Sequence, residues 1–408
     1  MRFLKKLFGL NGPKAEPPNE QDRFAAVVLD AVRHVDPEIE LEYRPEQFEF
    51  VSPGGQKTFL SNSFIEYSRL PEQERPMHLH RLAAFISDSR KPLPKGEEAL
   101  DALLPVLRAR ADLIAVTSEM ASWPYSRASR PFCENMLLLL AVDTERAIAL
   151  VTDETLDEMG VSFDEALAIA IGHLDDRDNH QFGQIGDATF VSTCGDYYDA
   201  GRILVPGLIE NLPVKGKPVA IVQSRSAVVV TGSDDMEGLE LIANCVWEDF
   251  PENERAVSLT PIVLEDGEWR PFPIAPHHPQ ALKNLIPSQA QWSYGATHDL
   301  LQDMLGDDLF VANPIVFKHE ANDRIAIFAS WATGVPTACP IVDAVIIQQD
   351  GDFPEITRRL EDVIEVCGPF APVSELPYPP RLTLPAQPDR AQRRALTDNY
   401  PHYEPFGS

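Results

Sequence analysis

Apolar residues recur along this chain at two spacings, one typical of helices and one typical of strands. Val28, Val32 and Val35 repeat every three or four residues, and Pro37 ends the helix that they predict. Further helices are predicted around 79–86, 156–159, 162–174, 199–204, 239–247, 297–304 and 356–367. Alternating or continuous apolar runs predict strands at 39–43, 48–50, 104–108, 136–142, 147–151, 188–193, 219–222, 227–230, 259–264, 309–317 and 325–331. This irregular order of helices and strands is typical of an α+β fold.

Short local signals place several of the element boundaries. Ser162 followed by Glu165 forms a capping box, which starts a helix. The Asp266-Gly267 pair lies between two strand-like runs and predicts a tight hairpin turn. Thr297 can cap a further helix, and Gly306 closes it.

These elements group into two or three modules of antiparallel or mixed sheet with packed helices. A chain of 408 residues is longer than one hydrophobic core usually serves. Its 36 prolines gather in the connections and in the last forty or so residues, where the chain is expected to cross the surface or hang free. The predicted divisions are a flexible amphipathic leader at 1–19, an N-terminal α+β module at 20–95, a central α+β module at 99–272, a C-terminal α+β module at 273–370 and a Pro-rich tail at 371–408.

Charge indicates which partners the protein can bind, and cysteine content indicates its compartment. With 35 Lys and Arg against 63 Asp and Glu, the net charge of −28 repels phosphate backbones, so no nucleic acid is expected as a partner. No apolar run reaches the roughly 18 residues of a spanning helix, although the basic and apolar residues at 2–8 allow weak peripheral membrane contact as well as a frayed leader. The five cysteines contain no CxxC pair, which indicates a reducing compartment and hence the cytoplasm.

Two segments resemble a known family. Residues 196–204 read Asp-Tyr-Tyr-Asp-Ala-Gly-Arg-Ile-Leu and are similar to the Asp-Gly-Tyr-Asp-Ala-Ser-Arg-Ile-Leu segment of domain-of-unknown-function family 1444, the YtpQ-like uncharacterised bacterial proteins. Residues 104–108, Leu-Pro-Val-Leu-Arg, are similar to that family's Tyr-Pro-Val-Ile-Arg, and the order of elements looks alike over about 20–272. Tyr197 and Gly201 depart from the family pattern. The family has no known activity, so the resemblance implies a module order and supplies no chemistry.

The same segment contains the candidate ligand-binding residues. Asp199 and Arg202 are three residues apart, which places a carboxylate and a guanidinium on one helical face. Asp196 and Tyr198 lie beside them, and Arg108 can converge on the same place to form an anion pocket. A structural interpretation competes, in which Asp196 or Asp199 caps the helix and Arg202 pairs with a carboxylate.

Other polar residues are weaker candidates. The donors within 173–180 can in principle ligate a metal, but their spacing fits no established metal loop, and no metal or cofactor is predicted. Cys194 precedes a predicted helix start, where a lowered pKa makes a nucleophile, although a buried thiol is the simpler interpretation. The donors within 173–180 are His173, Asp175, Asp176, Asp178 and His180. Two other histidine pairs, His78 with His80 and His277 with His278, have spacings that do not suit a shared metal ion, so these four histidines are predicted to lie on the surface.

The sequence therefore favours a non-catalytic cytoplasmic binding or interaction protein, with an unknown protein or a small polar ligand as its partner. No GxSxG, Walker or GxGxxG motif supports a standard enzyme class. The alternative is a hydrolase or transferase, and the sequence leaves open whether the protein is an enzyme. That alternative has a polar pocket built around Arg108, Asp196, Tyr198, Asp199 and Arg202.

Overall fold

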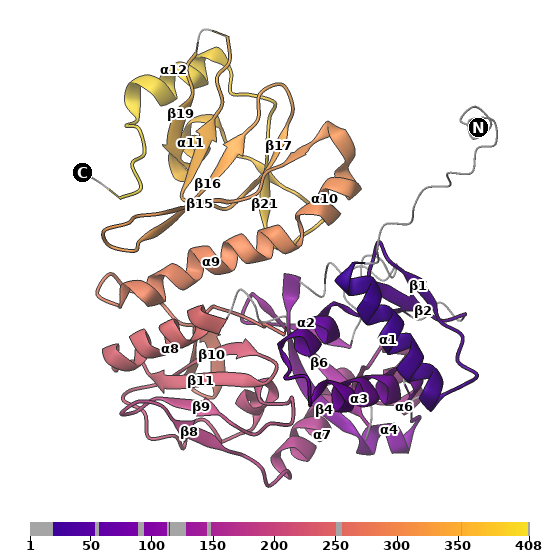
Figure 1. The fold of residues 1–408 in the computed structure, drawn as a ribbon. Coiled ribbons are helices and arrows are strands. Elements are labelled where there is room, and N and C mark those ends of the chain that lie inside the picture. Colours follow the sequence, from indigo (N-terminus) through magenta and orange to yellow (C-terminus); the bar gives the residue numbers. More distant parts are fainter. Residues whose placement is uncertain are drawn as a thin grey trace, which may run out of the picture. The chain divides into compact units, whose positions relative to one another are not determined.

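The computed structural model shows an α+β fold (Figure 1). It describes residues 19–53, 57–88, 94–111, 114, 128–144, 148–249, 255–351 and 353–406. The described residues fall into two compact units, one within 1–94 and 143–149 and the other within 95–142 and 150–408. Apart from Asn19, the predicted leader at 1–19 lies outside the described residues.

The N-terminal unit packs helices against a small antiparallel sheet of strand order β1-β2-β3. Its elements are α1 (Glu20–Val35), β1 (Glu42–Arg44), β2 (Glu49–Val51), β3 (Lys57–Phe59), α2 (Ser61–Arg69) and α3 (Arg75–Asp88). The Asn19 side chain accepts a hydrogen bond from the Asp22 amide at 2.7 Å, which caps α1. The predicted helical face of Val28 and Val32 is fully buried in this core.

The second unit begins with a sheet whose central strand is almost wholly apolar. The elements from 97 to 175 are α4 (Glu97–Asp101), β4 (Leu103–Ala109), β5 (Ser129–Phe132), β6 (Met136–Asp143), β7 (Ile148–Leu150), α6 (Asp153–Met159) and α7 (Phe163–Asp175). The last residue of β6 and the first two residues of β7 belong to the 143–149 segment of the other unit. Strand β6 pairs antiparallel with β4 and β5, and residues 136–142 are all buried. The capping box of Ser162 and Glu165 is confirmed at the start of α7, where the Glu165 amide donates to Ser162 Oγ at 3.3 Å.

A larger antiparallel sheet follows, with strand order β13-β12-β10-β11-β9-β8. Its segment comprises β8 (Phe182–Gln184), β9 (Phe190–Ser192), the 3-10 helix η2 (Ala200–Leu204), β10 (Pro218–Ser224), β11 (Ala227–Gly232), α8 (Met236–Asp249), β12 (Ile262–Glu265) and β13 (Glu268–Pro271). Both faces are covered, since Ala220 packs in the core that includes β4, β6 and α7, whereas Ile221 packs toward α8. The predicted hairpin turn is confirmed, with positive φ at Asp266 and Gly267.

The C-terminal region adds two mixed sheets, of strand order β15-β16-β18-β19 and β14-β17-β21-β20. Its elements are α9 (Gln280–Ala296), α10 (His298–Leu305), the 3-10 helix η4 (Gly306–Asp308), β14 (Phe310–Val311), β15 (Ile315–Lys318), β16 (Ile325–Trp331), β17 (Thr337–Pro340), β18 (Ala344–Ile347), β19 (Ile356–Arg359), α11 (Leu360–Cys367), β20 (Ala371–Pro372), β21 (Arg381–Leu384) and α12 (Arg390–Asn399). The helix predicted over 356–367 begins only at Leu360, because residues 356–359 form β19. Thr297 precedes α10 but makes no side-chain capping bond there.

The long helix α9 connects the C-terminal sheets to the rest of its unit (Figure 1). Leu282 and Leu285 pack in the same core as the buried face of α8, and the Leu259 amide donates to Gln289 Oε1 at 2.7 Å. At the far end, Tyr294 Oη donates to the Pro380 carbonyl at 2.7 Å. Neither α9 nor another helix of the described ranges has the length and apolar character needed to cross a membrane.

The described part of 371–408 is folded, so the prediction of a tail that crosses the surface or hangs free is wrong there. Strand β21 pairs along β17, and Leu384 is fully buried. Leu396 of α12 fills the same core, and the Tyr403 amide donates to the Thr357 carbonyl at 3.1 Å. Prolines stand mainly at the ends of these short elements, where a missing N–H does not interrupt a ladder or a helix.

Candidate functional site

Asp196, Tyr198 and Asp199 lie on the turn that leads from β9 into η2, and Arg202 lies within η2. Tyr197 adopts a left-handed backbone conformation with a φ of 66°, and Asp196 Oδ1 accepts a hydrogen bond from the Tyr198 amide at 3.1 Å. This turn directs the following residues inward, so that Tyr198, Asp199 and Arg202 are all buried.

Arg202 is at the centre of a closed hydrogen-bond network. Its Nη1 and Nη2 donate to the two carboxylate oxygens of Asp196, each at 2.8 Å. Its Nη2 also donates to Asn179 Oδ1 at 2.7 Å, and its Nε donates to His180 Nδ1 at 3.1 Å. Asp196 accepts further hydrogen bonds from Asn179 Nδ2 at 3.2 Å and Arg177 Nη1 at 3.1 Å. Arg202 is fully buried, and its hydrogen bonds connect residues 179–180 to the turn that contains Asp196.

The same network controls the charge of Asp196. Burial opposes ionisation of this carboxyl, but the hydrogen bonds from Arg202, Asn179 and the Tyr198 amide outweigh burial and hold its pKa well below the usual range. A carboxylate held this way is already neutralised by its protein partners. The pair therefore matches the structural interpretation of this segment more closely than that of an open ligand site.

Asp199 does not cap the helix that follows it. The sequence allows Asp199 to be either a helix cap or a ligand-binding residue, and the structure corrects the first of these two roles. Its backbone is already helical, with φ of −52° and ψ of −45°, and its side chain makes no capping bond to η2. Oδ1 instead accepts a hydrogen bond from the Cys194 amide at 3.1 Å. Within the described part of the chain, Oδ2 is buried without a hydrogen-bond partner.

Arg108 lies in a different charged environment from Arg202. It is half-buried near the end of β4, opposite Leu137 of β6, and its Nη1 donates to the Leu107 carbonyl at 2.9 Å. Burial, and then repulsion from Arg225, lowers the pKa of Arg108 to about 9; Tyr198 opposes that shift and Arg255 adds to it. Arg108 therefore groups with two other arginines.

Backbone hydrogen bonds bring these arginines together from distant parts of the chain. Arg225 occupies the turn between β10 and β11, where its amide donates to the Arg255 carbonyl at 3.0 Å and its carbonyl accepts from the Ala200 amide at 3.3 Å. The guanidinium carbon of Arg255 is 4.9 Å from the centre of the Tyr197 ring. We call Arg108, Arg225 and Arg255 the arginine cluster. Sequence reasoning found only Arg108, because neither Arg225 nor Arg255 belongs to a local motif.

Cys194 does not have the lowered pKa expected of a nucleophile at a helix start. Burial is the largest influence on the thiol, and it raises the pKa. The Gln181 amide donates to Cys194 Sγ at 3.4 Å, which gives the sulfur a structural contact.

The two histidines among the candidate metal donors at 173–180 make hydrogen bonds within the protein. His173 Nδ1 lies 3.0 Å from the Leu103 carbonyl, and His180 accepts from Arg202. Across the described ranges, no three or more His, Cys, Asp and Glu side chains are grouped to hold a metal ion.

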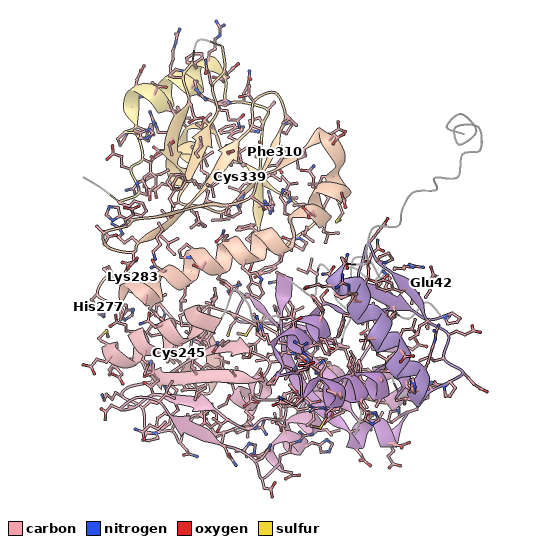
Figure 2. All side chains as sticks on the ribbon, in the orientation of Figure 1. Glu42, Cys245, His277, Lys283, Phe310 and Cys339 are labelled. Atoms are coloured by element: carbon pink, nitrogen blue, oxygen red, sulfur yellow. The ribbon has the colours of Figure 1, made fainter. Side chains whose placement is uncertain are left out.

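His278 is buried, so the prediction that it is a surface histidine is wrong. Its Nδ1 accepts a hydrogen bond from the Ala275 amide at 2.9 Å, and its ring stacks on Phe272 with 5.2 Å between ring centres. Burial lowers its pKa, and the nearby charges of His277 and Lys283 act in the same direction. Figure 2 shows these last two residues near the start of α9. His277 itself is exposed, as predicted.

Comparisons with protein-family models, with curated proteins and with solved structures find no match for this chain. The resemblance at 104–108 and 196–204 therefore stays a prediction. The two arginine environments differ in charge, since Arg202 is bound to a carboxylate and Arg108 lies near Arg225 and Arg255.

Proposed function

We propose that this chain is a non-catalytic cytoplasmic binding protein whose ligand is a small anion held by the arginine cluster. The observation that carries the proposal is the convergence of Arg108, Arg225 and Arg255 beside Tyr197 and Tyr198. Residues from β4, from the β10–β11 turn and from the segment before β12 meet there, so the cluster is a product of the fold.

The chemistry of the cluster suits an anionic ligand. Guanidinium groups bind phosphate and carboxylate with paired hydrogen bonds. The protein as a whole carries −28, so an anion needs arginines that the fold brings together at one place. Tyr197, beside Arg255, has 54% of its surface exposed, which gives the ligand an approach.

The non-catalytic part of the proposal draws on the chemistry of the neighbouring side chains. The raised pKa of Cys194 makes it a poor nucleophile, and Asp196 is engaged by Arg202. Cys133, Cys194, Cys339 and Cys367 are free thiols, which supports a reducing compartment such as the cytoplasm. Kinship with domain-of-unknown-function family 1444 belongs to the same proposal. On this view the shared Asp and Arg of the 196–204 segment are kept for folding.

Thermal unfolding in inorganic phosphate tests the proposal. Phosphate should raise the midpoint relative to sodium chloride of equal ionic strength, because a ligand at 100 times its Kd stabilises the folded state by about 2.7 kcal/mol. Arg108→Gln and Arg255→Gln should abolish that rise. Arg270→Gln is the matched control, since it removes an exposed arginine of the same unit that pairs with Glu268. It should keep the full response.

Each outcome is informative. An unchanged midpoint for the wild type in phosphate, sulfate and citrate would refute anion binding. If Arg270→Gln and Arg108→Gln lost the phosphate-induced rise of the midpoint equally, the rise would come from general electrostatics and not from a site. Turnover of a phosphate or carboxylate ester that disappears in Arg108→Gln would replace the binding proposal with the hydrolase or transferase alternative.

A further inference from the structure

The C-terminal region contains a cavity of about 270 Å³ that lies outside the candidate site. It is bounded by the end of β16, the loop after β18 and the first turn of α12, and Trp331, Phe353 and Arg393 are among its lining residues. Drug-sized ligands occupy pockets of about 300–1,000 Å³, so this cavity suits a smaller molecule.

Arg393 gives the cavity a buried donor. The residue is 3% exposed, and its Nη2 donates to the carbonyls of Gln348 at 3.0 Å, Ile347 at 3.4 Å and Pro354. These contacts hold the guanidinium in place. Its Nε is buried and has no hydrogen-bond partner in the described part of the chain. A buried donor of this kind is costly unless a ligand or a water molecule accepts from it.

The charged groups around the cavity balance. Arg390 and Arg393 supply two positive charges, and Asp350 and Asp389 supply two negative ones. Burial lowers the pKa of Arg393, and the Asp350 charge opposes that shift. Asp350 is held at one side by reciprocal backbone hydrogen bonds with Phe353, at 3.1 and 2.9 Å. Unlike the arginine cluster, this cavity favours a ligand with no net charge and separated charges of both signs.

Different lining residues of the cavity suit the negative and the positive group of such a ligand. Arg390 is the first residue of α12, and its guanidinium favours a carboxylate. The helix start itself is capped by Asp389, whose Oδ1 accepts a hydrogen bond from the Gln392 amide at 2.8 Å. Asp350 favours an ammonium group. Trp331 already donates its indole N–H to the Pro385 carbonyl at 2.6 Å, so it offers the cavity an apolar ring. Gln348 and Gln387 add amide groups at the edge.

We propose that this cavity binds a small zwitterion of the amino-acid class, with its carboxylate toward Arg390 and Arg393 and its ammonium group toward Asp350. Binding of this kind is independent of the anion site. The two proposals can therefore fail separately, and Arg108→Gln should bind the zwitterion as the wild type does.

The test titrates the proteinogenic L-amino acids, one at a time, into the full chain and follows thermal unfolding and heat of binding. At least one should bind. The amine that lacks its carboxylate and the hydroxy acid that lacks its ammonium group should each bind at least about tenfold more weakly. Asp350→Asn and Arg390→Gln should weaken binding of the amino acid by a similar factor. Arg393 is left unchanged because it also holds three carbonyls.

Arg394→Gln and Asp398→Asn are the matched controls, because both residues are exposed on α12 and neither lines the cavity. Both controls should bind as the wild type does. The proposal is wrong if no amino acid binds, if the amine and the hydroxy acid bind as tightly as the parent, or if the controls lose as much affinity as Asp350→Asn.

Discussion

Arg202 and Asp196 form a two-point ion pair, in which Nη1 and Nη2 each lie 2.8 Å from a different carboxylate oxygen. Arg202 is fully buried, and Asp196 retains 18% of its side-chain exposure. Since the pair also binds Asn179, it joins two stretches of chain that flank β8 and β9. We expect this pair to stabilise the fold, and we propose the arginine cluster as the ligand site.

Arg202→Ala should lower the free energy of unfolding by about 3–5 kcal/mol, because it leaves the Asp196 carboxylate without its buried partner. Urea unfolding measures the loss. Arg177→Ala is the control, since Arg177 contacts the same carboxylate at 3.1 Å from a more exposed position. It should cost about 1 kcal/mol or less. An Arg202→Ala protein as stable as the wild type would contradict a structural role.

Asp196 should make the stability depend on pH in the acid range. Its pKa is held below the unfolded value, so its contribution is complete above the unfolded pKa of about 3.9 and is lost as the pH falls through the folded pKa. Urea midpoints of wild type and Asp196→Asn should therefore converge as the pH is lowered below about 4. A difference that stays constant down to the lowest pH at which the protein folds would show that the charge of Asp196 is not involved.

Asp199→Asn and Asp199→Ala should differ in stability. The Asn side chain can still accept from the Cys194 amide through its Oδ1 and removes a buried charge whose Oδ2 lacks a hydrogen-bond partner within the described chain. Asp199→Ala removes the acceptor and should cost about 1–3 kcal/mol. We expect Asp199→Asn to unfold at a urea concentration at or above that of Asp199→Ala. The reverse order would show that the carboxylate charge itself is required.

The last described helix should be essential to the C-terminal fold. Leu396 is fully buried in the core that includes Leu384 and Trp331, so Leu396→Ala should cost about 2–5 kcal/mol. Asp398→Ala, on the exposed side of α12, should change stability by less than about 0.5 kcal/mol. A negligible effect of Leu396→Ala would mean that α12 is only loosely attached.

Local chemistry made much of the fold predictable from the sequence. The capping box of Ser162 and Glu165 and the turn at Asp266-Gly267 both depend on neighbouring residues, and both are confirmed. Helix α9 was not predicted, because it contains Pro287 and polar residues such as Gln289 that become buried only through tertiary contacts. The sequence predicts residues 356–359 as part of a helix, because a strand of four residues is too short to show a clear period.

The candidate site was predictable only in part, for a related reason. The spacing rule applies to Asp199 and Arg202, which are three residues apart, whereas the carboxylate that pairs with Arg202 belongs to Asp196, six residues before it. Arg225 and Arg255 reach Arg108 through the register of the larger sheet and the turn after β10, and no short pattern encodes that convergence. The preference of Asp for helix caps does not predict the role of Asp199, because its side chain accepts a hydrogen bond from the Cys194 amide instead.

Calorimetric titration of inorganic phosphate into wild type, Arg108→Gln and Arg202→Lys tests the central claim most directly. Arg202→Lys keeps a positive charge but loses the two-point pairing. The account predicts that Arg202→Lys binds phosphate within about threefold of wild type while unfolding at a lower urea concentration. It predicts that Arg108→Gln keeps the urea midpoint in the absence of phosphate and loses binding. The opposite result, with binding lost in Arg202→Lys and kept in Arg108→Gln, would move the ligand to the Asp196 turn and contradict the account.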